Sequence, residues 1–287
     1  MSSFSLHGAA VLTLQTALGL AASGCVDISA GDAQLIDTTE KRFSVSGAPS
    51  VTVGTFDGSV EVSTWDRPEV LVTIERRAMS RDEAERMVIT ADQRGDDISV
   101  QVKSTRAGGF HINFGTFNAR LIVSVPAKAR IDASTGDGRV TVRDVEGDLV
   151  AHTGDGSIHL EHVNGAVDAS SGDGNIIVDG QIRQLRARSG DGRVRVQASG
   201  SAPTGDWSLA TGDGSVILEV PAGFGAELDA RTGDGRVEVR DVDFERESGE
   251  HSRTSAKGRI GSGGPKVTIR SGDGSIVVRR AGASSES

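Results

Sequence analysis

The sequence predicts an all-β protein, a single-stranded β-solenoid with about 18–22 residues per coil and one short capping helix near residues 81–90. The phrase [Ser/Thr]-Gly-Asp-Gly-x-[Val/Ile]-x-apolar occurs seven times, and its aspartates follow one another at steps of 18, 18, 18, 22, 21 and 39 residues. Small or apolar residues alternate with charged ones around each phrase, which is typical of strands with one buried face. Glycine is abundant, with 38 residues, and aromatic residues are scarce, at 3%. This composition favours a thin, turn-rich β architecture.

Each copy of the phrase is predicted to form a corner between two strands. Around one copy the inward residues are Leu185, Ala187 and Ser189, followed by Val194 and Val196, so the inward phase slips by one residue at the glycines. Glycine permits unusual backbone angles there, and aspartate can bond its own turn. A single coil cannot bury its apolar side, so we expect coils to stack about 4.8 Å apart, with equal positions in rows along the axis.

The first 25 residues predict export and lipid anchoring. Residues 8–22 are apolar and lead to Ala22-Ser23-Gly24-Cys25, which is typical of a signal peptide over residues 1–24. Cys25 is the only cysteine, and its position resembles the modified cysteine of a bacterial lipobox. We therefore expect an extracytoplasmic lipoprotein, facing the periplasm or the cell surface, whose lipid at Cys25 enters the membrane. The alternative is ordinary cleavage that leaves a free thiol. A net charge of −9 argues against nucleic acid as a partner.

The remaining segments are assigned in order. Polar residues 25–42 are predicted to be the lipidated tether, and residues 43–130 an N-terminal β block. The capping box that begins at Ser80 and ends at Glu83 predicts the helix at 81–90. Residues 131–280 hold the regular repeats, in which the step of 39 is interpreted as two coils with one degraded turn. Residues 241–258 are predicted to be a protruding loop, and residues 281–287 a disordered tail.

Several segments together resemble a known family: Val60-x-Val62-x-x-Trp65, Val70-x-Val72, Leu121-x-Val123-x-Val125-Pro126, the repeated corners, and Gly258-Arg259-Ile260-Gly261-x-Gly263. Over residues 43–280 the chain resembles the bacterial "putative adhesin" β-strand-repeat family of unknown function. It is also similar to head domains of the GIN type and to LiaG-like envelope proteins. The resemblance implies a β-helix-like domain outside the cytoplasm, and it brings no catalytic residues to this chain.

The corner aspartates form the first candidate site: Asp137, Asp155, Asp173, Asp191, Asp213, Asp234 and Asp273. Stacking would place these carboxylates in a row about 5 Å apart, with mild repulsion of roughly 1 kcal/mol between neighbours in water. One interpretation is a row of Ca²⁺ sites, because hard cations favour carboxylate oxygens. We favour the alternative, in which each aspartate bonds its own turn and no metal or other cofactor is required. The inward hydroxyls beside them are expected to satisfy corner amides.

The second candidate is a group of arginines on one coil: Arg186, Arg188, Arg193 and Arg195. They could bind an anionic polymer or an envelope protein, although a solvated face paired with aspartates of neighbouring coils is the simpler interpretation. A metal site at His152, His159, His162 and Glu161 is disfavoured, because His159 and His162 lie on different strand phases.

We expect a non-enzymatic, adhesin-like binding or scaffold module of the cell envelope, with no catalytic or metal-ligating residues. The alternative is a β-helical glycan-active enzyme, a lyase or hydrolase. Such an enzyme needs paired carboxylates in a cleft and aromatic subsites, so the surface of the molecule distinguishes the two. Trp65 and Trp207 are the two tryptophans, and the strand phase predicts that Trp207 points inward.

Overall fold

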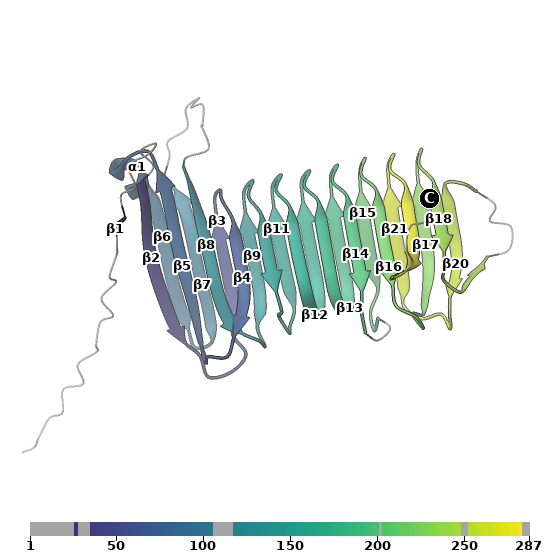
Figure 1. Ribbon diagram of the computed structural model, residues 1–287, viewed down its shortest axis with the longest axis horizontal. Helices are drawn as coiled ribbons and strands as arrows, with labels where there is room; N and C mark the ends of the chain where they lie inside the picture. The colour runs from purple at the N-terminus through teal and green to yellow at the C-terminus, as the bar shows by residue number, and fades with distance from the viewer. Residues whose placement is uncertain (1–25, 28–34, 106–116, 201–202, 248–251, 283–287) are drawn as a thin grey trace, which may run out of the picture.

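The computed structural model describes residues 26–27, 35–105, 117–200, 203–247 and 252–282. These residues form a continuous 22-stranded sheet wound into a solenoid, together with the short helix α1 (Arg81–Glu85) (Figure 1). The predicted all-β solenoid is confirmed. Within the described part of the chain, no helix is long and apolar enough to cross a membrane.

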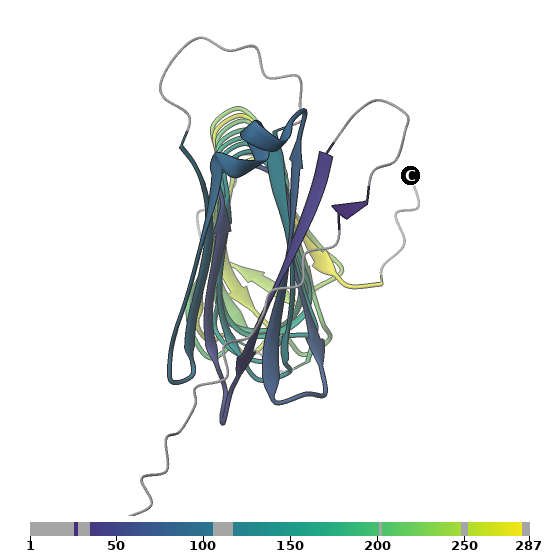
Figure 2. The ribbon, with the colours of Figure 1, turned by 90° about the vertical axis from the view of Figure 1, so that its left-hand side faces the viewer.

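Each coil consists of two strands joined at the corner phrase, so the wound sheet has two faces that pack against each other. Figure 2 shows both faces in a view along the solenoid. Strands before the corner make the leading face, and strands after it make the trailing face. Neighbouring coils pair in parallel with matched positions, for example Leu149 with Val167 and Val140 with Ile158.

The leading face contains β3 (Ser50–Thr55), β7 (Asp97–Ser104), β9 (Arg130–Thr135), β11 (Leu149–Thr153), β15 (Trp207–Thr211), β17 (Ala226–Thr232) and β21 (Lys266–Ser271). The trailing face contains β4 (Val60–Trp65), β8 (Asn118–Pro126), β10 (Val140–Arg143), β14 (Val194–Ala198), β16 (Val216–Val220), β18 (Val237–Arg240) and β22 (Ile276–Arg280). Two long strands run from the trailing face into the leading face: β12 (Ile158–Ser171) and β13 (Ile176–Ser189).

The core lies between the two faces and is built from Val, Ile, Leu and Ala. Along one coil, Ile131 and Ala133 before the corner and Val140 and Val142 after it are all fully buried. The inward positions therefore slip by one residue at the corner, as the sequence predicts. Trp207 also points inward and is 2% exposed, which confirms its predicted orientation.

At both ends, the order of the coils in space differs from their order in the sequence. The last repeat, β21 and β22, lies between the coil of β15 and β16 and the coil of β17 and β18. At the other end, β3 and β4 lie between β9 and β10 on one side and β7 and β8 on the other.

The interpretation of the 39-residue step as two coils is therefore wrong. The step holds β19 (Phe244–Arg246) and β20 (Ser255–Ile260), after which the chain returns to the inner side of β17. β20 pairs antiparallel with the outer side of β17, and β19 pairs with β20. The prediction of a protruding loop at 241–258 is thus corrected, because this hairpin covers an otherwise unpaired sheet edge.

Two predictions at the N-terminal end also need correction. Residues 35–42 of the predicted tether belong to β2 (Leu35–Ser44), which pairs antiparallel with β5 (Glu69–Ala78) and covers the edge of the trailing face. The short β1 (Val26–Asp27) pairs with β2. The tether prediction failed because it relied on polarity, and an edge strand exposes polar side chains.

The predicted helix is shorter than expected. It ends at Glu85, and Met87 begins β6 (Met87–Arg94), which pairs antiparallel with β7 along its whole length. Backbone pairing over eight residues of β6 stabilises the strand more than the few apolar residues Ala84, Met87 and Val88 could stabilise a longer helix. The helix start is confirmed, since the Ser80 hydroxyl accepts a hydrogen bond from the Glu83 N–H at 3.2 Å. Cys25, the signal peptide and residues 283–287 of the tail lie outside the described residues.

Candidate binding surfaces

The inward hydroxyls of the corners hold successive coils together. Ser189 donates a hydrogen bond to the carbonyl of Gly174 at 2.8 Å and accepts one from the N–H of Gly192 at 3.0 Å. The same donation to the preceding coil joins Thr135 to Gly58, Thr153 to Gly138, Ser171 to Gly156, Thr211 to Gly192, Ser271 to Gly214 and Thr232 to Gly274. These buried hydroxyls satisfy corner backbone groups, as the sequence predicts.

The corner glycines are required because the backbones of neighbouring coils approach each other closely at the corners. Only one of them, Gly58, has an unusual backbone angle. Gly58 has a φ of 108°, whereas Gly190 and the other repeated corner glycines lie outside the positive-φ set. A Cβ on Gly190 would overlap the carbonyl of Gly172 and lie 2.8 Å from Oδ1 of Asp173. The expected reason for these glycines is therefore corrected: adjacent corners stack too closely for a side chain.

The seven predicted corner aspartates are all exposed along one edge of the solenoid. Among the described residues, no group of three or more His, Cys, Asp or Glu side chains is arranged to hold a metal ion. Ca²⁺ binding by the row stays a prediction that we do not favour.

Asp57 extends the row by one position, in the corner Phe56-Asp57-Gly58-Ser59-Val60 between β3 and β4, which the sequence shows as a degraded copy of the repeated phrase. Burial raises the pKa of Asp57; the backbone N–H of Gly58 partly opposes this shift, and the charge of Asp137 adds to it. Asp57 is half-buried, unlike the seven exposed corner aspartates, and beside it Phe56 contacts Phe117 with ring centroids 5.3 Å apart. A carboxyl group with a raised pKa therefore lies at one end of the row.

The predicted arginine patch is divided between two faces. Arg186 and Arg188 project from the leading face, Arg195 projects from β14 on the trailing face, and Arg193 lies at the corner between them. Arg186 and Arg188 form no ion pair within 4 Å among the residues that the structure describes, so at most this pair could act together. Whether they bind a polymer stays a prediction.

Arg195 instead belongs to a charged cluster that sequence reasoning missed. Glu219 of β16 points outward but is only 5% exposed, because arginines on both neighbouring coils cover it. Arg195 donates to its carboxylate at 2.8 and 3.2 Å, and Arg279 donates at 2.6 and 3.0 Å. Burial raises the pKa of Glu219, but these charged hydrogen bonds more than offset it, so its pKa is lowered. Aligning the repeats in their spatial order would have revealed the cluster.

The three histidines do not converge. His152 lies on the leading face, whereas His159 and His162 lie on the trailing part of β12. His162 is 75% exposed, with Nδ1 at 3.3 Å from Asp144 and Nε2 at 4.0 Å from Asp179. Burial, and then the charge of Arg139, lower the pKa of His159. His152 therefore lies on a different face of the solenoid from His159 and His162.

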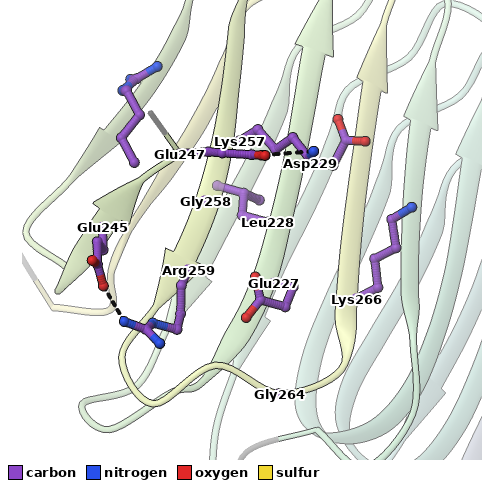
Figure 3. A pocket seen from close by; sticks show the side chains of 11 residues that line it. Glu227, Leu228, Asp229, Glu245, Glu247, Lys257, Gly258, Arg259, Gly264 and Lys266 are labelled. Carbon is purple, nitrogen blue, oxygen red and sulfur yellow. Dashed lines mark hydrogen bonds and ion pairs between the residues drawn. The ribbon is translucent and has the colours of Figure 1, made fainter. Parts of the chain in front are cut away.

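A groove of about 630 Å³ lies at the C-terminal end, over β17, β19, β20 and β21 (Figure 3). Its floor includes Leu228 and Gly258, and a Cβ on Gly258 would lie 2.9 Å from the Cα of Arg246, so this glycine lets β19 approach. The lining carries four acidic side chains, Glu227, Asp229, Glu245 and Glu247, and four basic ones, Arg246, Lys257, Arg259 and Lys266. No aromatic side chain belongs to this lining. The sequence missed the groove because its hairpin was predicted to be a loop.

Most charges in the groove are already paired. Lys257 lies 2.8 Å from Glu247, and Arg259 pairs with Glu245. Asp229 accepts from Arg270 of β21 at 3.0 Å and from Arg231 of β17 at 3.2 Å, two side chains that do not belong to the lining of the groove. Burial raises the pKa of Asp229, but the two arginines more than offset it, so its pKa is lowered.

Two charges of the groove stay available. Glu227 and Lys266 occupy matched positions on β17 and β21, and within the described residues neither forms an ion pair within 4 Å. Glu227 and Lys266 therefore place one negative and one positive charge on neighbouring strands of the groove, where a ligand could contact both.

Comparisons with known proteins place the chain in a family. Three solved structures are similar. A "putative cell adhesion protein" from Clostridium sporogenes is 15% identical, with 85% of this chain and 99% of that chain covered and a TM-score of 0.42. A "putative adhesin" from Bacteroides fragilis and another from Parabacteroides distasonis are each 11% identical, with 84% of this chain and 96% of that chain covered, and their TM-scores are 0.38 and 0.41. No curated protein matches. The profile of the Toastrack DUF4097 family matches residues 49–197 and, overlapping, 166–279. The chain therefore belongs to the Toastrack DUF4097 family, and the resemblance to a bacterial adhesin-like β-repeat family of unknown function is confirmed.

Proposed function

We propose that this protein is a non-enzymatic, extracytoplasmic binding module of the cell envelope, anchored through Cys25 at one end and binding a partner in the C-terminal groove at the other. The observation that carries the proposal is the position of the groove. It lies at the opposite end of the solenoid from β2, where the chain enters the fold (Figure 1). Eight stacked corners give seven steps, so the row of corners alone spans about 34 Å, and β8, β5 and β2 extend the sheet beyond its first corner.

The chemistry of the groove supports binding of a charged partner. Acidic and basic side chains are equal in number, and the unpaired Glu227 and Lys266 offer one charge of each sign. A protein segment that carries both signs fits this arrangement, because complementary charges fix register and orientation at an interface.

The same chemistry disfavours the glycan-active enzyme. Such an enzyme requires one carboxyl group with a raised pKa, to act as a general acid, and aromatic side chains under the sugar rings. Asp229 has a lowered pKa instead, and the lining of the groove is not aromatic. The groove therefore supports recognition better than glycoside cleavage.

Affinity capture tests the proposal. Detergent-solubilised full chain is immobilised and incubated with envelope fractions, and captured proteins are compared among wild type, Glu227→Lys, Lys266→Glu and the control Arg186→Ser/Arg188→Ser. We expect a partner that wild type and the control retain and that both groove variants lose.

Two results would contradict the proposal. Loss of the partner in the arginine control, with retention in the groove variants, would move binding to the leading face. Release of new reducing ends from envelope glycans by the purified protein would establish the enzyme instead.

A further inference from the structure

The last repeat is an insertion between two coils that precede it in the sequence. We call residues 266–280, which form β21 and β22, the C-terminal insert, and the space it fills between β15/β16 and β17/β18 the slot. On the leading face Val267 pairs with both Trp207 and Leu228, and on the trailing face Ile276 pairs with both Val216 and Val237. The insert thus has a full parallel ladder on each side.

The slot itself supplies the contacts that hold the insert. Hydroxyls bond it on both sides, with Ser271 donating to Gly214 at 2.9 Å and Thr232 donating to Gly274 at 2.7 Å. Ion pairs do the same: Arg279 reaches Glu219 on one side, and Arg270 reaches Asp229 on the other. These partners all lie within residues 206–240. The same repeat supplied by another copy of the chain would find every one of them.

A five-residue hinge connects the insert to the preceding strand. β20 ends at Ile260 and β21 begins at Lys266, with Gly261-Ser262-Gly263-Gly264-Pro265 between them. Gly261, Gly263 and Gly264 have φ values of 54°, 77° and 148°, so the hinge bends through conformations that other residues rarely adopt. Short hinges favour the exchange of an element between identical chains, because an extended hinge can join two chains without making the tight bend.

The slot can also close when the insert leaves. The coil of β17 and β18 carries the same inward pattern as the insert, and Arg240 occupies the position of Arg279, so it could take over the contact with Glu219. In the sequence, the corner aspartates Asp213 and Asp234 are separated by almost the same length of chain as Asp191 and Asp213, whose corners stack directly on each other. The connection is therefore long enough for direct stacking. Closure of the slot would keep Glu219 covered, but the inward side chains of the released insert, Val267, Ile269, Ile276 and Val278, would be exposed until a second copy buries them.

We propose that the C-terminal insert is exchanged between copies of this chain, so that a second copy fills the slot and the two form a swapped dimer. The surface involved is the inner wall of the slot, and the partner is residues 266–280 of the second copy. The swapped contacts repeat those within one chain, and only the hinge changes conformation.

Disulfide trapping tests the proposal in the full chain carrying Cys25→Ser. One preparation carries Ile217→Cys and another Val277→Cys, at half-buried, register-matched positions on β16 and β22. The two are mixed, unfolded in urea, refolded together and oxidised. We expect a disulfide-linked heterodimer, because exchange places Val277→Cys of one chain beside Ile217→Cys of the other.

The matched control mixes Ile217→Cys with Glu238→Cys. Exchange leaves Glu238 with its own chain, so these two cysteines meet only by collision, and we expect no heterodimer above background. Equal yields in both mixtures would overturn the proposal.

A second variant removes Ser262 and Gly263, which shortens the hinge from five residues to three and disfavours the turn back into the slot of the same chain. We expect light scattering to give a dimer mass for this variant. A monomer with the wild-type melting temperature would also contradict exchange. The groove shares Gly264 with the hinge and Lys266 with the insert, but both experiments measure links between copies of the chain and need no bound partner. Failure of the proposed binding function would therefore leave both results readable.

Discussion

Replacing Gly190 by alanine tests the claim that close stacking explains the corner glycines. The new Cβ would overlap the carbonyl of Gly172 and lie 2.8 Å from Asp173 Oδ1, so the two corners must separate. Overpacking of this kind costs about 1–3 kcal/mol. Separation also weakens the backbone bond from Gly190 to Gly172 and the hydroxyl bond from Ser189 to Gly174, at about 1 kcal/mol each. We expect the free energy of unfolding to fall by about 3–5 kcal/mol.

Urea denaturation measures this loss as a lower transition midpoint at unchanged slope. Hydrogen exchange should show the lost protection concentrated in the coils on either side of Gly190. The control is Gly205→Ala, in the connection before β15, where the new Cβ would come no closer than 3.3 Å, to Gln184. There we expect a change below about 1 kcal/mol. Equal losses at the two glycines would refute the stacking argument.

Four further predictions concern charge, metal and lipid. Asp57→Asn should raise the melting temperature at pH 7 but not at pH 3, because a folded pKa raised above 3.8 penalises the ionised form, and the penalty disappears as pH falls through that pKa. Glu219→Gln should destabilise by about 2 kcal/mol at pH 7, and the difference should shrink below pH 4.5, since the lowered folded pKa contributes stability only where the carboxylate is ionised. Millimolar Ca²⁺ or EDTA should leave the melting temperature unchanged, and a rise of many degrees with Ca²⁺ would make the aspartate row a metal site. Cys25→Ser should move the protein from the detergent phase to the soluble or uncleaved precursor fraction, and a freely soluble wild type with an unmodified thiol would contradict lipid anchoring.

The regular part of the fold was predictable because each coil repeats the same local chemistry. The corner phrase and the alternation beside it establish which residues point inward, and the hydroxyl bond of Ser189 follows from its place at the corner. The outward positions are less informative. Phase alone shows that Arg188 and Arg195 are exposed, but the corner between them sends them to opposite faces.

The two ends were not predictable, since near-identical repeats can stack on one another in more than one order. The sequence cannot decide whether Val216 pairs with Val237 or with Ile276, because both follow the same corner phrase. The antiparallel strands at the ends decide it through long-range pairing. Their sequences carry too little alternation to distinguish β20 from a loop or β6 from a helix, and the groove depends on β20.

The displaced end coils also determine when each part of the protein can fold as the chain emerges during synthesis. In the central coils, Leu149 pairs with its counterpart in the very next repeat, Val167, so each coil can join the stack almost as soon as it appears. At the ends, Ser50 pairs with Arg130, and Val216 pairs with Ile276. In both pairs the second residue is synthesised much later than the first, so the pairing is delayed. Contacts that are distant in sequence form slowly because a large loop must close first. We therefore expect the middle of the solenoid to form first, and the two ends, one where the chain enters the fold and the other bearing the groove, to be completed last.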